Sequence, residues 1–221
     1  MTLFDTLNSM REIPTEALTK KLTDLNPHWK AGAIDSAVKN FRKRGYFELF
    51  FPLVHQSGVH RAVILMGPRR AGKTVILQQT IQTLIEHRVP AKNVLYLSLD
   101  VPLFQGLSLE ELVDLYSKLH GKDSIEGCFV FFDEIQYHAN WGQHLKVLVD
   151  RDKKTRFVAS GSAAATLNRQ SKESGAGRFT DFLLPPLTFY EYLDLLELTD
   201  KLIKENSDSA VISVEAKKIC C

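Results

Sequence analysis

An eight-residue segment between two contrasting apolar patterns limits the folds open to this chain more than any other feature. The segment reads Gly67-Pro68-Arg69-Arg70-Ala71-Gly72-Lys73-Thr74. A short apolar run typical of a buried strand, 62–66, precedes it, and apolar residues at helical spacing, from Leu77 to Ile85, follow it. A strand, a glycine-containing turn and a helix in this order predict a P-loop. Its place in the pattern makes a chance match improbable.

The residue types of the segment suit the binding of phosphate. Gly67 and Gly72 can adopt the conformations of a tight turn, which lets backbone N–H groups approach phosphate oxygens. The following helix adds the positive end of its dipole. We expect Lys73 to reach the β- and γ-phosphates and the Thr74 hydroxyl to serve as a hard oxygen ligand for magnesium. The segment therefore predicts ATP and Mg²⁺ as cofactors.

Two adjacent carboxylates end a second apolar run. Phe129 to Phe132 reads as a strand, and Asp133 and Glu134 follow it, as in a Walker B segment. Asp133 is expected to hold magnesium, directly or through water. Glu134 is suited to orient and polarise the water that attacks the γ-phosphate. Paired acids after a strand are common at loops, so their meaning depends on the upstream P-loop.

Further candidate residues follow the later strands. Ser160 could contact the γ-phosphate or the attacking water, or it could belong to a simple turn. Arg178, after a polar loop at 171–177 that we expect to be mobile, could neutralise phosphoryl charge in its own or a neighbouring subunit, or form a structural ion pair. Arg69 and Arg70 could touch phosphate or face a neighbour. The predicted catalytic residues are Lys73, Glu134, Ser160 and Arg178; the predicted nucleotide contacts are 67–74 and Asp133; the predicted magnesium ligands are Thr74 and Asp133.

From residue 62 onward, short apolar runs alternate with amphipathic segments. This alternation predicts βα units, and hence an α/β fold of three layers around a mainly parallel sheet. Ser108 with Glu111, and Thr188 with Glu191, form capping boxes that predict two helix starts. The predicted strands are 62–66, 94–99, 129–132, 156–160 and 182–184.

The chain divides into three parts by composition. Residues 1–58 form a helical N-terminal segment, with helices expected from Pro14 to Leu25 and from Ile34 to Arg44. Basic residues between Lys39 and Arg44 read as a solvated face, with a phosphate-contacting patch as the alternative. Residues 59–200 form the P-loop domain. Residues 201–221 form a polar tail, which we expect to begin a truncated C-terminal region.

The balance of charge excludes a strong global field. Lys and Arg number 28 and Asp and Glu 26, giving a net charge of +2, so a nucleic-acid partner would need a local patch and remains open. No apolar segment is long enough to cross a bilayer, and the first residues do not resemble a secretory signal, so we expect a cytoplasmic protein without a membrane partner. Three cysteines form neither a disulfide framework nor a metal-ligand spacing.

Five segments in order carry a resemblance to a known family. They are Asn26 to Trp29, Met66 to Thr74, Asp133 to Tyr137, Ala159 to Ala163 and Ser174 to Pro186. The chain resembles, from about Asn26 to Leu198, prokaryotic AAA-type ATPases whose ATPase domain is usually followed by an uncharacterised, nuclease-like C-terminal domain.

The resemblance implies a central P-loop strand flanked by the Walker B and sensor strands. It also implies ATP binding and hydrolysis, without a well-established cellular substrate. Two departures stand out. The usual C-terminal domain is absent because the chain stops at Cys221, which suggests a truncated form or a shortened reading frame. His28 stands where a second aromatic residue is expected.

Three functions compete. The first is an ATPase that drives a conformational change in a partner or attached domain. The second is a nucleotide-gated binding module with little turnover. The third, a small-molecule kinase, is weakened because Glu134 beside Asp133 suits activation of water and no arginine-rich lid is evident. The sequence names no protein partner and leaves a homo-oligomer open.

Overall fold

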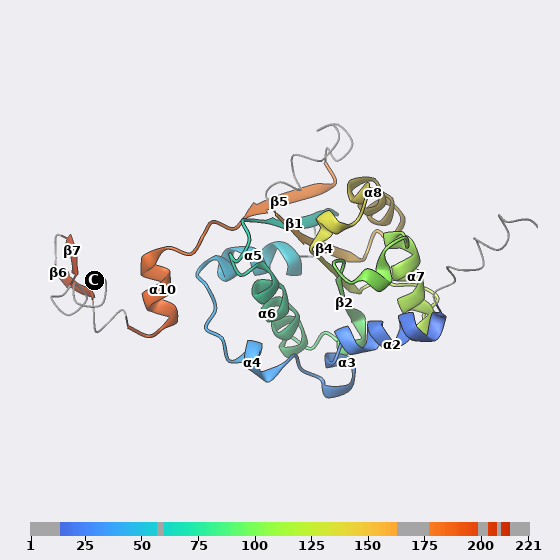
Figure 1. Cartoon of the computed structure of the whole chain (residues 1–221), viewed down its shortest axis with the longest axis horizontal. Coiled ribbons are helices and arrows are strands. Elements are labelled where there is room, and N and C mark those ends of the chain that lie inside the picture. The colour runs from blue at the N-terminus through green and yellow to red at the C-terminus, as the bar shows by residue number, and fades with distance from the viewer. Residues whose placement is uncertain (1–13, 57–59, 163–176, 199–202, 207–208, 213–221) are drawn as a thin grey trace, which may run out of the picture.

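A five-stranded parallel sheet forms the centre of the computed structural model, which describes residues 14–56, 60–162, 177–198, 203–206 and 209–212. The strand order is β2-β3-β4-β1-β5 (Figure 1). Every neighbouring pair runs parallel. The predicted α/β fold is therefore confirmed. The strands are β1 (Ala62–Met66), β2 (Val94–Ser98), β3 (Phe129–Asp133), β4 (Arg156–Gly161) and β5 (Phe179–Leu183).

The place of β1 in the sheet corrects one expectation. The resemblance implied that the Walker B strand and the sensor strand would flank β1. β1 does pair with β4, the strand that ends at Ser160, but its other neighbour is β5, and the Walker B strand β3 lies beyond β4. The centre belongs to β4, whose residues Phe157 to Gly161 are all buried. This order still brings the ends of β1, β4 and β3 to one edge of the sheet.

Helices cover both faces of the sheet and complete the three layers. Alternate residues of β1 face opposite sides. Ile64 joins the core under α2 (Thr15–Leu25), α7 and α8, and Leu65 joins the core under α5 (Tyr46–His55) and α6. Figure 1 shows the two groups of helices on either side of the strands. The helices that flank the sheet after the P-loop are α6 (Lys73–Glu86), α7 (Leu109–Leu119) and α8 (Trp141–Arg151), with short 3₁₀ turns η2 (Ala91–Asn93), η3 (Pro102–Phe104) and η4 (Ile135–Tyr137).

Both predicted capping boxes are present. The Ser108 hydroxyl accepts from the Glu111 amide at 3.2 Å, and the Ser108 amide donates to the Glu111 carboxylate at 2.7 Å, at the start of α7. Thr188 and Glu191 exchange the same pair of bonds, both at 3.2 Å, at the start of α10 (Phe189–Leu195). Each box satisfies amides that a helix start leaves without partners.

Within its described residues, 14–56, the N-terminal segment contains the helices α2 (Thr15–Leu25), α3 (His28–Ala31), α4 (Ser36–Lys39) and α5 (Tyr46–His55). The start and end of α2 match the prediction. The helix expected from Ile34 to Arg44 is wrong in extent, because only one turn, α4, forms there. The sequence reasoning missed α5, whose Phe47, Phe50 and Val54 are buried at helical spacing around an internal Pro52.

Asn26 fastens this segment to the sheet. Its amide donates to the Tyr96 carbonyl at 2.9 Å, and its carbonyl accepts from the Tyr96 amide at 2.7 Å. The side chain thus pairs with edge strand β2 as a neighbouring strand would. His28 and Trp29 add ring N–H donors to the Val94 carbonyl at 3.0 and 2.7 Å.

The C-terminal part departs from expectation. Antiparallel strands β6 (Ile203–Asn206) and β7 (Ser209–Ile212) pair where no regular unit was predicted. The loop expected at 171–177 lies outside the described residues apart from Gly177. The domain boundaries at residues 58 and 200 stay predictions. Across the described ranges, no helix combines the length and apolarity that crossing a bilayer requires.

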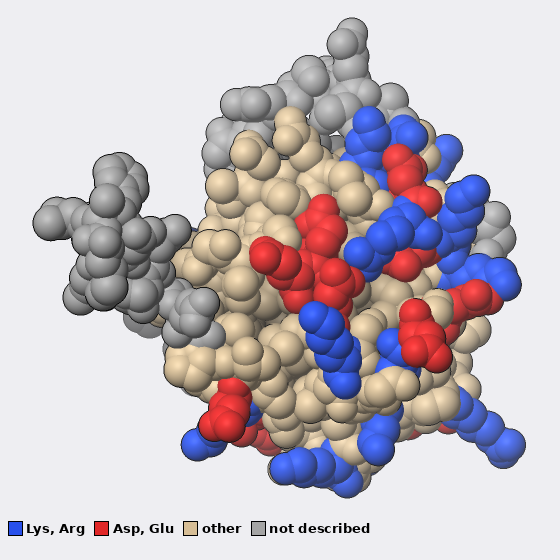
Figure 2. All heavy atoms as spheres, turned by 90° about the vertical axis from the view of Figure 1, so that its right-hand side faces the viewer, with Lys and Arg blue, Asp and Glu red and all other residues tan. Residues whose placement is uncertain are grey.

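Charges of both signs share the surface that carries α7. Figure 2 shows this face, with Lys and Arg lying among Asp and Glu. Arg151 on α8 pairs with Asp114 on α7 at 3.2 Å and with Asp152 at 2.8 Å. Such exposed pairs contribute little stability each. Neither sign dominates this face, in keeping with the net charge of +2.

Candidate nucleotide-binding site

The P-loop connects the end of β1 to the start of α6, and its two glycines serve different needs. Gly72 caps α6 with φ of 86°, a conformation that strains any residue with a Cβ. At Gly67 a Cβ would lie 2.5 Å from the backbone oxygen of Leu184. The chain after β5 therefore packs against the loop so closely that only glycine fits at position 67.

Lys73 lies folded into its own loop. Its side chain is buried, and Nζ donates to the carbonyls of Gly67 and Pro68 at 3.0 Å each. The ammonium group thereby sits over the turn in which Arg70 has φ of 66°. Arg69 and Arg70 are exposed on this loop.

Asp133 is the centre of the site. Its carboxylate accepts hydrogen bonds from the hydroxyls of Thr74 and Tyr96 through Oδ2, at 2.7 and 2.8 Å. Oδ1 accepts from the Ser160 hydroxyl and from the Glu134 amide, the latter at 3.1 Å. The residue is 1% exposed. The structure thus brings together the P-loop threonine, the Walker B aspartate and the end of β4.

Tyr96 is a site residue that the sequence reasoning missed. It lies on β2 and reaches Asp133 with its hydroxyl. Burial, and then the nearby Asp133 carboxylate, raise the pKa of Tyr96 well above its usual range, so it remains a proton donor. The sequence held no signal for it, because its contact with Asp133 depends on the pairing of β2 with β3.

Gln136, which donates a hydrogen bond to Glu134, is a second site residue that the sequence reasoning missed. The Glu134 backbone is in the left-handed region, with φ of 55°, which is uncommon outside glycine. Gln136 donates its amide to the Glu134 carboxylate and accepts from the Ser162 amide at 3.2 Å. Gln136 therefore ties this carboxylate to the segment that follows β4.

Ser160 lies inside β4 and is fully buried. Besides donating to Asp133, its hydroxyl accepts from the Glu134 amide at 3.4 Å. The alternative of a simple turn is wrong, because the side chain organises both acidic residues. Its predicted contact with the γ-phosphate or the attacking water stays a prediction.

Arg178 is the one predicted catalytic residue that the structure does not bring to the site. It precedes β5, and its carbonyl accepts from the Ala62 amide at the start of β1, whereas the P-loop follows the end of β1. These two ends lie roughly 13 Å apart at about 3.3 Å per residue. Its guanidinium pairs with Asp150 on α8 at 2.6 Å. A role in its own P-loop is therefore corrected to a structural ion pair, and a role in a neighbouring subunit stays a prediction.

Comparison with known proteins places the chain in a family. A family model described as an AAA domain matches residues 59–193, more than half of the chain. The chain belongs to the AAA domain family. Membership gives it a nucleotide-binding function of the ATPase type.

Individual proteins that resemble this chain share less than a third of its sequence. An uncharacterised protein of Haemophilus influenzae is 28% identical over 150 residues, which cover 64% of this chain and 37% of that protein. Among solved structures, Aeropyrum pernix ORC1 in complex with DNA has a TM-score of 0.46 and 14% identity, covering 85% of this chain and 49% of that one. PCH-2 of C. elegans has a TM-score of 0.45 and 17% identity, covering 84% and 54%. The AAA domain chain thus spans about a third to a half of these proteins.

The donor set in this AAA domain fits magnesium. Thr74 Oγ1 and Asp133 Oδ2 are hard oxygen atoms 2.7 Å apart. Neighbouring ligands around an octahedral Mg²⁺ lie about 3 Å apart, close to this separation. Within the described part of the chain, no three His, Cys, Asp or Glu residues gather as a metal cage.

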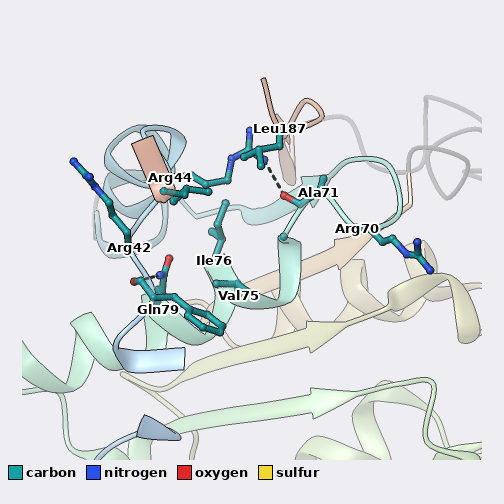
Figure 3. Close-up of a pocket in the computed structure, with 11 residues that line it drawn as sticks. Arg42, Arg44, Arg70, Ala71, Val75, Ile76, Gln79 and Leu187 are labelled. Atoms are coloured by element: carbon teal, nitrogen blue, oxygen red, sulfur yellow. Dashed lines mark hydrogen bonds between the residues drawn. The ribbon is translucent and has the colours of Figure 1, made fainter. Parts of the chain in front are cut away.

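A pocket of about 270 Å³ opens beside the P-loop (Figure 3). Val75 and Ile76 of α6 line it together with Leu187 and Leu195, and Phe41 adds an aromatic ring. Ala71 and Gly72 of the loop itself also line the pocket. An apolar cavity here is suited to a planar ring attached to bound phosphates.

The basic residues before α5 are not a solvated face throughout. Arg44 is 7% exposed and bonded to Glu191 and to Ala71 in the P-loop. Lys43 donates to the Thr83 hydroxyl at 3.0 Å, and Arg42 pairs with Asp194 at 3.0 Å. The prediction of a solvated face is therefore wrong for Arg44, which is buried and joins the P-loop to α10 through hydrogen bonds.

Proposed function

We propose that this AAA domain binds ATP with Mg²⁺ in the loop 67–74 and hydrolyses the γ-phosphate to drive a conformational change in a partner or attached domain. One observation carries the proposal: the Thr74 hydroxyl lies 2.7 Å from Asp133. This contact joins the two segments that a P-loop ATPase uses to hold nucleotide and metal.

Binding uses groups that already converge on one edge of the sheet. Phosphate oxygens would take the place of the Gly67 and Pro68 carbonyls as partners of the Lys73 ammonium. Amides of the loop and the first turn of α6 add further donors, because a helix start leaves them without partners in the helix. The adenine ring would enter the apolar pocket beside Val75 and Ile76.

Hydrolysis requires a water molecule aligned with the γ-phosphate. Glu134 would accept a proton from that water as it attacks phosphorus, while the bond to the β-phosphate oxygen breaks. Mg²⁺, held by Thr74 and Asp133, would neutralise charge on the β- and γ-phosphates. Ser160 and Tyr96 keep the Asp133 carboxylate in place through their hydroxyls.

A second candidate, a binding module with little turnover, is favoured by one contact. The Gln136 amide donates to Oε2 of Glu134 and so competes with a water molecule for this carboxylate. A domain that kept this contact with ATP bound would hold nucleotide without cleaving it.

Phosphate release separates the two candidates. We expect magnesium-dependent release from ATP by the wild type. Glu134→Gln should bind ATP within about threefold of wild type and turn it over at least about 100-fold more slowly, as expected when a general base is lost. Glu126→Gln, the same acid-to-amide change at an exposed residue that pairs with Lys154, is the control for altered charge. ATP binding without phosphate release by the wild type would favour the binding module. Full turnover by Glu134→Gln would contradict the role of Glu134.

A further inference from the structure

A buried arginine outside the P-loop joins segments that are far apart in the sequence. Arg44 lies just before α5, and its Nε and Nη2 donate to the two carboxylate oxygens of Glu191 on α10 at 3.0 and 2.8 Å. The side chains are 7% and 17% exposed. The Arg44 guanidinium lowers the pKa of Glu191, so the carboxylate remains charged.

The same guanidinium also holds backbone carbonyls. Nη1 donates to Ala71 at 2.8 Å, the bond drawn in Figure 3, and to Pro185 at 3.1 Å. Nη2 donates to Pro186 at 3.5 Å. A guanidinium has five N–H groups, and these bonds with the two to Glu191 use all of them. Arg44 therefore has no donor left for a ligand, and its role must act through its partners.

Ala71 is a partner that a bound nucleotide would affect. It lies between Arg70 and Gly72, both with positive φ, and its amide donates to the Pro68 carbonyl at 3.3 Å. The same Pro68 carbonyl accepts from Lys73. When phosphate draws Lys73 away, the hydrogen bonds around Pro68 and Ala71 must rearrange, and Arg44 holds the Ala71 carbonyl on the other side.

α10 borders the nucleotide pocket at a second place. Leu195 of α10 and Leu187, just before this helix, line the pocket together with Val75 and Ile76. A ring that filled the cavity would contact both leucines directly. A nucleotide would therefore act on α10 from two directions, through its phosphates by way of Arg44 and through its ring by way of the pocket.

We propose that Arg44 is a positioning residue that couples occupancy of the P-loop to the placement of α10. The proposal rests on the ATP binding proposed above and adds how the bound state is transmitted. α10 carries exposed aromatic side chains at Phe189, Tyr190 and Tyr192. Nucleotide binding fixes the orientation of these rings, and loss of nucleotide releases it.

Hydrogen exchange of the amides at 189–196 tests the coupling, alongside titration with a fluorescent ATP analogue. In the wild type, a slowly hydrolysed ATP analogue with Mg²⁺ should slow this exchange by about fivefold or more, the lower end of typical coupling between sites. Arg44→Lys and Glu191→Gln should lose most of this slowing. Because coupling is reciprocal, both should bind nucleotide about fivefold or more weakly.

Asp194→Asn is the matched control. Asp194 also ties α10 to the N-terminal segment through Arg42, but this pair is exposed, whereas Arg44 is buried and bonded to Ala71 of the P-loop. The control should keep the nucleotide-dependent slowing. Wild-type protein that binds nucleotide with unchanged exchange in α10 overturns the coupling and leaves the proposed function intact. The coupling is also overturned if Glu191→Gln is folded, as measured by circular dichroism, and keeps the full nucleotide-dependent slowing of exchange. Failure of the wild type to bind nucleotide would overturn both proposals.

Discussion

At the scale of single residues, Gly67 shows how a neighbour far along the chain can restrict one position. The backbone oxygen of Leu184 occupies the space that any side chain would need. Because the blocking atom belongs to the backbone of the segment after β5, it cannot turn aside. The restriction therefore belongs to the packing of two segments rather than to the turn itself.

Gly67→Ala should accordingly destabilise the domain and weaken nucleotide binding. A small-to-large change in a tight site costs about 1–3 kcal/mol of unfolding free energy. Gly142→Ala is the matched control, because a Cβ there meets nothing within 4 Å and the residue lies in α8. It should leave stability unchanged or raise it by up to about 1 kcal/mol. Urea denaturation measures both, and equal stability of the two variants would contradict the close approach.

The residue scale also shows what the sequence could and could not predict about the site. Lys73, Thr74 and Asp133 were predicted together, because strand ends in a parallel sheet meet at one edge. The prediction that Arg178 lies at the P-loop of its own subunit was wrong. Arg178 precedes β5, so it lies where the parallel strands begin, whereas the P-loop lies where β1 ends. Tyr96 could not be assigned, since its contact depends on the pairing of β2 with β3.

At the scale of elements, regular amphipathic segments were predictable and short or irregular ones were not. The capping boxes of α7 and α10 depend only on residues three apart, so the sequence alone defines them. Helix α5 contains Pro52, and a proline inside a segment argues against a helix. The helix forms because Phe47 and Phe50 are buried in the core beside the sheet, which the sequence alone does not show. The order of β1, β4 and β3 likewise depends on packing of the whole sheet.

Helix α3 makes the stability of the domain depend on pH. Burial lowers the pKa of His28, against the opposing effect of its bond to the Val94 carbonyl, and His120 also has a lowered pKa through burial and then nearby lysines. The unfolded chain therefore binds protons that the folded chain does not. The free energy of unfolding should have its full value above about pH 6.5. At lower pH it should decrease by up to about 1.4 kcal/mol per pH unit for each histidine.

Urea unfolding between pH 5 and pH 8 measures this dependence. His28→Gln keeps an amide donor for the Val94 carbonyl and removes the titration, so its stability should fall less steeply below pH 6.5. An identical pH dependence in the variant and the wild type would show that His28 does not contribute.

At the scale of the whole molecule, several parts of the chain meet at the edge of the sheet where β1, β4 and β3 end. The P-loop, the Asp133 site and the chain after β5 meet there, and Arg44 joins the N-terminal segment to them. Fold class followed from the alternation of strands and helices along the sequence. The connection through Arg44 did not, because it joins residues 147 positions apart.

Equilibrium binding of ATP, with and without Mg²⁺, tests the central claim most directly. We expect the wild type to bind ATP more tightly with Mg²⁺, and Lys73→Ala to lose about tenfold or more in affinity, as removal of a charged hydrogen-bonding partner costs about 1.5–3 kcal/mol. Lys153→Ala, an exposed lysine away from the P-loop, should bind as the wild type does. Equal affinity of wild type and Lys73→Ala, or no dependence on Mg²⁺, would contradict a nucleotide site formed by the P-loop and Asp133.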